Sequence, residues 1–343
     1  MVVLYVILAL FVFGILVMIH ELGHFLMARA FGVGINEFSI GMGPKILSKK
    51  GKKYYTVYSL RALPIGGYVS MVGEDEASDD PNAFGQKSVW KRILIVLAGP
   101  VMNILLGFLL TLILVLSTDK LASTTIGDFQ DGAISSVQLE IGDIVTHVNG
   151  TRVHTGNELV YEIMNKGYAP LDLTVIRNGQ ETTLEDVIFP GMETEGIAFG
   201  SPDFKVHIEA KNFGTVLKHT FFRSVSTVKM IFDQLFDLIR GRFGLNAVSG
   251  PIGITEEMGN AAKSGWDTFI YLVTVITVNL GVFNLLPIPA LDGGRLLFLI
   301  IEAVLRRPVN KNVEGYIHFA GLLLLFALMI VVACKDIIGL FIR

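Results

Sequence analysis

The chain has few of the residues that stabilise small secreted domains or bind nucleic acid. Its 343 residues include a single cysteine, Cys334, so no intramolecular disulfide can form and there is no cysteine-rich zinc site. Charged residues make up 17% of the chain and the formal net charge is −3, which gives no reason to expect a nucleic-acid partner. No lysine or arginine precedes the first apolar run and no small-residue cleavage pattern follows it, so a removable signal peptide is not expected.

What the chain has instead is apolar sequence in long blocks. Hydrophobic residues make up 52% of it, and four segments are long enough to cross about 30 Å of hydrocarbon, which takes roughly 20 helical residues. They are Val2–Met27, Ile93–Ser117, Trp266–Leu286 and His318–Cys334. We therefore predict a polytopic α-helical membrane protein with four transmembrane helices in a lipid bilayer and a polar insert between the second and third.

The distribution of basic residues predicts how these helices cross the membrane. Lysines and arginines concentrate in the loop between the first two spans and in the loop after the third. They are Arg29, Lys45, Lys49, Lys50, Lys52, Lys53, Arg61, Lys87, Lys91 and Arg92, and then Arg295, Arg306, Arg307 and Lys311. By the positive-inside rule both loops are cytoplasmic, which leaves both termini and the region 118–265 outside.

The insert has the pattern of a small β-rich domain over residues 124–205. Alternating apolar segments end in two Asn-Gly pairs, Asn149–Gly150 and Asn178–Gly179, which are typical of tight hairpin turns. Between them, Gly156–Lys166 has helical spacing. An inserted extracytoplasmic β-rich domain is therefore expected.

Residues 213–240 have apolar positions at helical spacing, but six charged residues interrupt them. This density of charge forbids a membrane span and predicts a helix at the membrane surface or over the core, with a plain amphipathic packing helix as the alternative. The expected parts are a first membrane half at 1–118, the β-rich domain at 119–206, a surface-helix region at 207–262 and a second membrane half at 263–343.

Three polar residues interrupt the first span near its predicted cytoplasmic end. His20, Glu21 and His24 form the pattern H-E-x-x-H, and ionisable groups are costly at this depth unless they are used. Positions i and i+4 put both imidazoles on one face of a helix, which is how one helix binds zinc. Glu21 is poorly placed to bind the same metal but can reach the water that a zinc ion activates and take its proton. The pattern points to an intramembrane metalloprotease.

A catalytic zinc usually has three protein ligands and an open position, so a third ligand is needed. Asp292 is the best candidate, because it lies at the cytoplasmic end of the third span and therefore at about the depth of His24. Pro287 and Pro289 end the helix, and the two glycines after Asp292 free the backbone to turn its carboxylate inward.

The loop between the first two spans predicts a membrane-associated β-hairpin. Tyr54–Leu60 alternates like a strand, and Tyr68–Val72 can return beside it after a turn that ends at Gly67. A transmembrane substrate must be unwound before cleavage, and its backbone groups then need new partners. Gly67, Tyr68 and Val69 could provide them by strand addition. An ordinary cytoplasmic hairpin is the alternative.

Together these motifs resemble the site-2 protease family, specifically the bacterial RseP-type regulators of intramembrane proteolysis. The resemblance covers H-E-L-G-H at 20–24, A-G-P-V-M-N at 98–103 and N-x-x-P-x-P-x-L-D-G-G at 284–294, in that order along the chain. It implies His20, His24 and Asp292 as ligands of Zn²⁺ and Glu21 as the catalytic base. It also implies that Asn284 helps to hold the substrate backbone, and Pro287 and Pro289 of the same motif are further candidates for substrate binding.

The insert resembles a single PDZ domain of the bacterial protease type, through G-D-I-V…V-N-G and V-I-R-N-G within 142–179. The best-known RseP-type members have two such domains in tandem. The resemblance implies a multi-pass protein of the bacterial inner membrane, with both termini and the PDZ-like domain outside and the active site near the cytoplasmic face. The PDZ-like domain would bar substrates with bulky external domains, although a spacer without a peptide ligand is the alternative.

The implied substrates are single-span membrane proteins, either anti-sigma factors already trimmed outside by a site-1 protease or remnant signal peptides. The main rival is a non-catalytic membrane adaptor with a structural zinc, but no fourth cysteine or histidine occurs at the right depth to close such a site. A set of two histidines and one carboxylate can also hold iron, so the preference for zinc rests partly on the resemblance.

Overall fold

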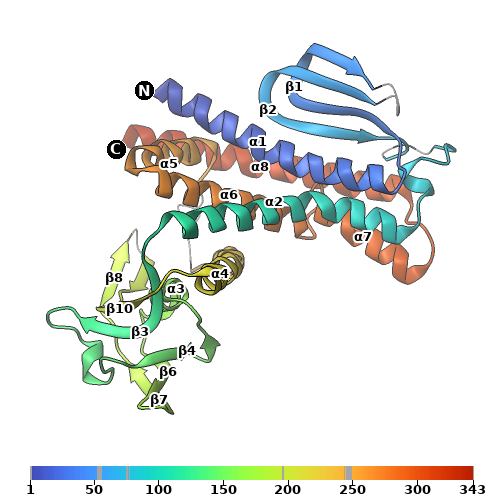
Figure 1. The fold of residues 1–343 in the computed structure, drawn as a ribbon. Coiled ribbons are helices and arrows are strands. Elements are labelled where there is room, and N and C mark those ends of the chain that lie inside the picture. The colour runs from blue at the N-terminus through green and yellow to red at the C-terminus, as the bar shows by residue number, and fades with distance from the viewer. Residues whose placement is uncertain are drawn as a thin grey trace. The chain divides into compact units, whose positions relative to one another are not determined.

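The computed structural model of the chain describes residues 2–51, 56–74, 76, 78–194, 197–242, 244 and 249–342. It divides into two compact units. One unit combines Met1–Gly107 with Gly244–Arg343, and the other is Phe108–Phe243. Each unit is described by itself (Figure 1).

The first unit is built on long apolar helices. The long apolar helices are α1 (Val2–Ala30), α2 (Val89–Ser117), α6 (Trp266–Leu285) and α8 (Lys311–Ile342), and α2 continues past Gly107 into the other unit. The first unit also contains the shorter helices α5 (Pro251–Ser264) and α7 (Asp292–Leu305) and a 3-10 turn η1 (Phe84–Gln86) before α2. Within the described residues, four helices are long and apolar enough to cross a membrane, as the sequence predicts. These four spans are Leu4–Ala30, Val89–Ser117, Trp266–Leu285 and Asn312–Ile338. The fourth begins before the predicted His318, because the prediction counted only its uninterrupted apolar run.

Small residues allow the helices of this unit to pack closely. A Cβ atom added to Gly23 of α1 would lie 2.3 Å from the carbonyl oxygen of Ala98 in α2. A Cβ atom on Gly281 of α6 would lie 2.9 Å from the carbonyl oxygen of Pro100, also in α2. Helices in membranes approach most closely where such residues meet. The backbone of α2 therefore packs closely against α1, which carries His20 and His24, and against α6, which precedes the loop to Asp292.

The loop between α1 and α2 forms a curled antiparallel sheet beside α1 (Figure 1). Its two long strands are β1 (Ile35–Lys50) and β2 (Val57–Met71). The hairpin predicted between residues 54–60 and 68–72 is wrong in its pairing, because both parts of β2 pair with β1: Phe38 lies opposite Tyr58 on one side and Val69 on the other. The sequence did not indicate β1, since Gly41 and the lysines around it are typical of a loop. Residues 52–55 lie outside the described part of the chain.

The second unit contains the β-rich insert. After β3 (Leu121–Phe129) and a 3-10 turn η2 (Ser135–Val137), the chain forms β4 (Ile144–Val148), β5 (Thr151–Arg152), α3 (Gly156–Lys166), β6 (Leu171–Arg177), β7 (Gln180–Val187), β8 (Gly191–Thr194), β9 (Ile197–Gly200), β10 (Phe204–Glu209) and α4 (Phe213–Ile239). The main sheet has the order β10-β3-β4-β6-β7, with β5 beside β4, and β8 pairs with β9.

The predicted turns and helices of this unit are present. Asn149 and Gly150 have φ of 46° and 73°, and Asn178 and Gly179 have φ of 53° and 80°, as a two-residue hairpin turn requires. The helix α3 has the predicted bounds. Tyr161 of α3 donates a hydrogen bond of 2.8 Å to Asp233 of α4, so α4 packs against the β-rich domain.

Candidate metal centre

The three predicted metal ligands lie together where α1 meets the start of α7. His20 and His24 are on α1, and Asp292 is the first residue of α7. The Oδ2 atom of Asp292 lies 2.9 Å from Nε2 of His20 and 3.3 Å from Nε2 of His24, and the two Nε2 atoms are 3.2 Å apart. Both histidines are 7% exposed. The structure therefore brings Asp292 beside two histidines that lie at least 268 positions earlier in the chain.

The chemistry of these atoms fits a metal ion. Nδ1 of His24 lies 2.9 Å from the carbonyl oxygen of Ile95, which can only accept a hydrogen bond, so Nδ1 carries the proton and the neutral ring presents a lone pair at Nε2. The Oδ2 atom of Asp292 is buried and has no hydrogen-bond donor among the described residues. Ligands that bind zinc tetrahedrally at 2.0–2.1 Å are about 3.3 Å apart, which matches the observed separations.

Asn103 of α2 lies beside the other imidazole. Its side-chain amide lies 3.4 Å from Nδ1 of His20, and its carbonyl oxygen is buried without a partner in the described part of the chain. An amide flip exchanges these two atoms and lets the oxygen accept from Nδ1. Asn103 lies in the A-G-P-V-M-N motif at 98–103, to which no role at the metal site was assigned from the sequence.

Gly99 leaves the space in which the ligand atoms meet. A Cβ atom at this position would lie 2.3 Å from Nε2 of His24 and 2.9 Å from Nε2 of His20. Any side chain at Gly99 would therefore occupy the place of a metal ion. A glycine inside an apolar helix was the available signal, because it indicates close approach of another group.

The glycines after Asp292 have a different role from the one expected. Gly293 and Gly294 do not have positive φ, because both are in the first turn of α7. A Cβ atom on Gly293 would lie 1.9 Å from the carbonyl oxygen of Leu286, and one on Gly294 would lie 2.6 Å from that of Ile288. The glycines thus let α7 begin directly against the loop that precedes it.

Glu21 is held by the edge of the hairpin sheet. Its Oε2 atom accepts a hydrogen bond of 2.9 Å from the backbone amide of Val69, in the last part of β2. A backbone amide leaves no signature in the sequence, so this contact could not be predicted. Val69 therefore lies beside the predicted base, whereas it was expected only to contact substrate.

A polar network inside the sheet fixes this edge. Glu37 of β1 accepts hydrogen bonds from Ser59 at 2.5 Å, Lys45 at 2.9 Å and Arg61 at 3.0 Å. Burial alone would raise the pKa of Glu37, but these hydrogen bonds lower it to about 2. Arg61 also donates a hydrogen bond of 2.6 Å to the hydroxyl of Tyr68, the neighbour of Val69. The predicted substrate-binding residue Gly67 is buried against β1, with its missing Cβ 2.6 Å from a backbone oxygen.

The residues of the N-x-x-P-x-P motif lie at and after the end of α6. Asn284 donates a hydrogen bond of 2.9 Å to the carbonyl oxygen of Leu280, so its amide is turned toward its own helix. Pro287 is exposed, and Pro289 packs against α8. The structure does not bring these three side chains into contact with the two histidines.

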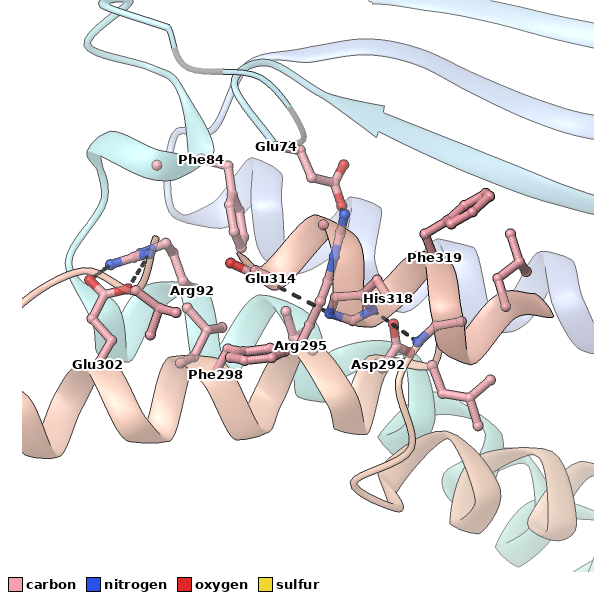
Figure 2. Close-up of a pocket in the computed structure, with 18 residues that line it drawn as sticks. Glu74, Phe84, Arg92, Asp292, Arg295, Phe298, Glu302, Glu314, His318 and Phe319 are labelled. Atoms are coloured by element: carbon pink, nitrogen blue, oxygen red, sulfur yellow. Dashed lines mark hydrogen bonds and ion pairs between the residues drawn. The ribbon is translucent and has the colours of Figure 1, made fainter. Parts of the chain in front are cut away.

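A cavity of about 520 Å³ adjoins Asp292 (Figure 2). Glu74 pairs with Arg295 of α7, and Arg92 at the start of α2 donates a hydrogen bond of 3.0 Å to Glu302 of α7. Arg295 and Glu302 are seven residues apart and so lie on one face of α7. These two ion pairs fix the rotation of the helix that carries Asp292.

Comparison with known proteins assigns the chain to a family. The model described as peptidase family M50 matches residues 8–328. The chain is 36% identical over 341 residues to a protein of Clostridium acetobutylicum assigned as a zinc metalloprotease, with 97% of each covered. It is 32% identical to zinc metalloprotease RasP of Geobacillus kaustophilus, with 95% of this chain and 96% of the relative covered. It is 31% identical to regulator of sigma-W protease RasP of Bacillus subtilis, with 96% and 97% covered.

The alignments with the two RasP proteins extend over 408 and 419 positions, more than the 343 residues of this chain, so those relatives carry additional segments. The match with the Clostridium acetobutylicum protein needs no such insertion, since it covers 341 positions. The chain belongs to peptidase family M50, the site-2 proteases, and is a zinc-dependent membrane metalloprotease of intramembrane proteolysis.

Proposed function

We propose that His20, His24 and Asp292 bind the catalytic zinc. The convergence of two neutral imidazole nitrogens and one carboxylate oxygen within 3.3 Å is the observation that carries this assignment. When bound, zinc acidifies a water molecule and polarises the carbonyl group of the peptide bond to be cleaved. The orientation of His24 by the Ile95 carbonyl and the space at Gly99 support the same assignment.

Glu21 acts as the general base in this proposal. It follows His20 directly, and its carboxylate is half-buried beside the metal ligands. From this position it takes a proton from the attacking water and gives it to the leaving amine. The Val69 amide keeps the carboxylate from rotating away, because a hydrogen bond from a backbone amide favours a single side-chain rotamer.

The edge of β2 binds the unwound substrate. Gly67, Tyr68 and Val69 belong to the part of β2 that pairs with β1 on one side only. An extended substrate segment can therefore add as a further strand along this edge, next to Glu21, through backbone groups other than the Val69 amide that Glu21 already binds. Asn284, with Pro287 and Pro289 after it, contacts the substrate backbone from the other motif, after its amide turns away from Leu280.

The remaining assignments concern topology and substrate. With the basic loops in the cytoplasm, both termini and the β-rich domain lie outside a bacterial inner membrane, and the metal site lies toward the cytoplasmic face. The β-rich domain is a single PDZ-like domain that excludes substrates with bulky external parts. The substrates are single-span proteins, namely anti-sigma factors after a site-1 protease has trimmed them, or remnant signal peptides. The name of the Bacillus subtilis relative, regulator of sigma-W protease, supports the first class.

The Glu21→Gln variant tests the proposed site. It keeps the shape of the side chain but removes the base, so we expect it to retain zinc and to lose cleavage of a model transmembrane substrate by a factor of at least about 100. The Asp292→Asn variant serves as the comparison and should lose zinc as well as activity. Cleavage that persists in Glu21→Gln, or zinc that remains fully bound in Asp292→Asn, would contradict the assignment.

A further inference from the structure

The loop that leads into Asp292 contains a residue in an unusual backbone conformation. Ala290 has φ of +74°, in the left-handed region that residues with a Cβ atom rarely adopt. Such a conformation persists only when neighbouring groups impose it, and it is often found close to functional sites. Because Ala290 lies two residues before Asp292, its torsion decides where the carboxylate points.

The group that holds Ala290 comes from the fourth span. Nδ1 of His318, in α8, lies 2.9 Å from the backbone amide of Ala290 and accepts its hydrogen bond (Figure 2). The amide of a residue at this turn would otherwise lack a helical partner. From the sequence, His318 was identified only as the first residue of the fourth predicted span.

A second contact holds the same loop from the same face of α8. A Cβ atom on Gly321 would lie 2.4 Å from Cβ of Pro289 and 2.8 Å from its carbonyl oxygen. His318 and Gly321 are three residues apart and therefore adjacent on one side of the helix. The backbone of α8 and one of its side chains thus fix two consecutive residues, Pro289 and Ala290.

We propose that His318 is a positioning residue for the metal centre. It holds Ala290 in the left-handed conformation and so directs the carboxylate of Asp292 toward His20 and His24. It acts through the backbone amide of Ala290. Metal–ligand distances tolerate changes of only about 0.2 Å, so a relaxed torsion at Ala290 would move the carboxylate out of range. The inference rests on the proposed role of Asp292 as a zinc ligand.

Three substitutions at His318 separate its hydrogen bond from its bulk. In His318→Asn the side-chain oxygen can take the place of Nδ1, whereas in His318→Gln the oxygen lies farther along the side chain, near the place of Nε2. His318→Phe keeps a ring beside Phe298, whose centroid is 5.7 Å from that of His318, but it has no acceptor. We expect zinc affinity to fall by about 10- to 100-fold in the Phe and Gln variants and by less than about threefold in the Asn variant, as for other groups that orient metal ligands.

A glycine at position 290 provides an independent test. Glycine adopts positive φ without strain, so Ala290→Gly should make the conformation less dependent on His318. In the Ala290→Gly background, His318→Phe should lose much less zinc affinity than it does with Ala290 present. The measurement is competition for zinc with a chelator on the purified full-length protein in detergent, which needs no substrate. Thermal unfolding of the zinc-free variants should be similar for Asn and Gln at position 318.

The possible outcomes distinguish this inference from the proposal on which it rests. If Asp292→Asn binds zinc normally, the ligand assignment fails. If Asp292→Asn loses zinc while His318→Phe and His318→Gln bind it as tightly as the unmodified protein, the positioning role is wrong. Equal losses in the Asn and Gln variants, or an undiminished loss in the Ala290→Gly background, would also overturn it.

Discussion

Replacement of Gly99 by alanine tests whether the ligand atoms meet around a metal ion. The new methyl carbon would lie 2.3 Å from Nε2 of His24 and 2.9 Å from Nε2 of His20. Non-bonded carbon and nitrogen atoms need well over 3 Å, so His24 would have to move by about 1 Å, several times the roughly 0.2 Å that zinc–ligand bonds tolerate. Zinc affinity should therefore fall by at least about 100-fold, beyond the range found when only an orienting group is lost.

The matched control is Gly107→Ala in the same helix. Its Cβ atom would also lie 2.3 Å from its nearest neighbour, but that neighbour is a methyl carbon of Val278 in α6. This variant should destabilise the packing of α2 by about 1–3 kcal/mol, as overpacking does, and should retain zinc.

The assay is the zinc content of each purified variant after dialysis against a weak chelator, with thermal unfolding measured in parallel. We expect Gly99→Ala to lose zinc while its helical circular dichroism stays intact. Gly107→Ala should keep zinc but unfold at a lower temperature. A Gly99→Ala protein that keeps one tightly bound zinc ion and cleaves substrate normally would refute the reasoning.

Two further predictions concern the hairpin and the β-rich domain. Val69→Pro removes the amide that binds Glu21, so cleavage should fall at least about tenfold while zinc content is unchanged; normal turnover would count against this role of the edge strand. Asp143 is buried and bound by Arg177 at 2.7 and 2.8 Å, and breaking such a pair in Asp143→Asn should cost about 3 kcal/mol at pH 7. Burial raises the pKa of Asp143, but the hydrogen bonds of Arg177 outweigh this and lower it. Its contribution is therefore present above the unfolded value of about 3.9 and is lost as the pH falls below it. Hydrogen exchange of β4 and β6 should show that the stability difference between the unmodified protein and Asp143→Asn shrinks at acidic pH. A stability difference that does not change with pH would contradict this.

The three proposed metal ligands could be picked out from the sequence because each carries a local signal. His20 and His24 have helical spacing within an apolar run, which is costly without a use for them. Asp292 was reached through the orientation of the spans, since only a group at the depth of His24 could complete the site. In the structure, ligand atoms of all three lie within 4.8 Å of one another.

The surroundings of the ligands were harder to predict, because they depend on backbone groups and on missing side chains. The Val69 amide and the Ile95 carbonyl have no pattern in the sequence. Gly99 signals that some group approaches α2 closely, but not that the group is the pair of imidazoles. His318 was predicted only to begin the fourth span, because its partner is the backbone of a loop 28 residues earlier in the chain.

The hairpin shows a different limit of sequence reasoning. Alternation of apolar and polar residues identified part of β2, but pairing is set by the three-dimensional path of the chain. In β1, Gly41 and Gly43 have φ of 83° and 84°, so a turn-like pattern lies within a strand. Both parts of β2 therefore pair with β1 and not with each other.

X-ray absorption at the zinc edge, on the purified protein and on its Asp292→Asn variant, tests the central assignment most directly. The account predicts one zinc ion per chain with nitrogen and oxygen neighbours at about 2.0–2.1 Å, two of them imidazoles, and loss of this signal in Asp292→Asn. A sulfur neighbour at about 2.3 Å, which Cys334 would have to supply, or an unchanged spectrum in Asp292→Asn, would contradict it.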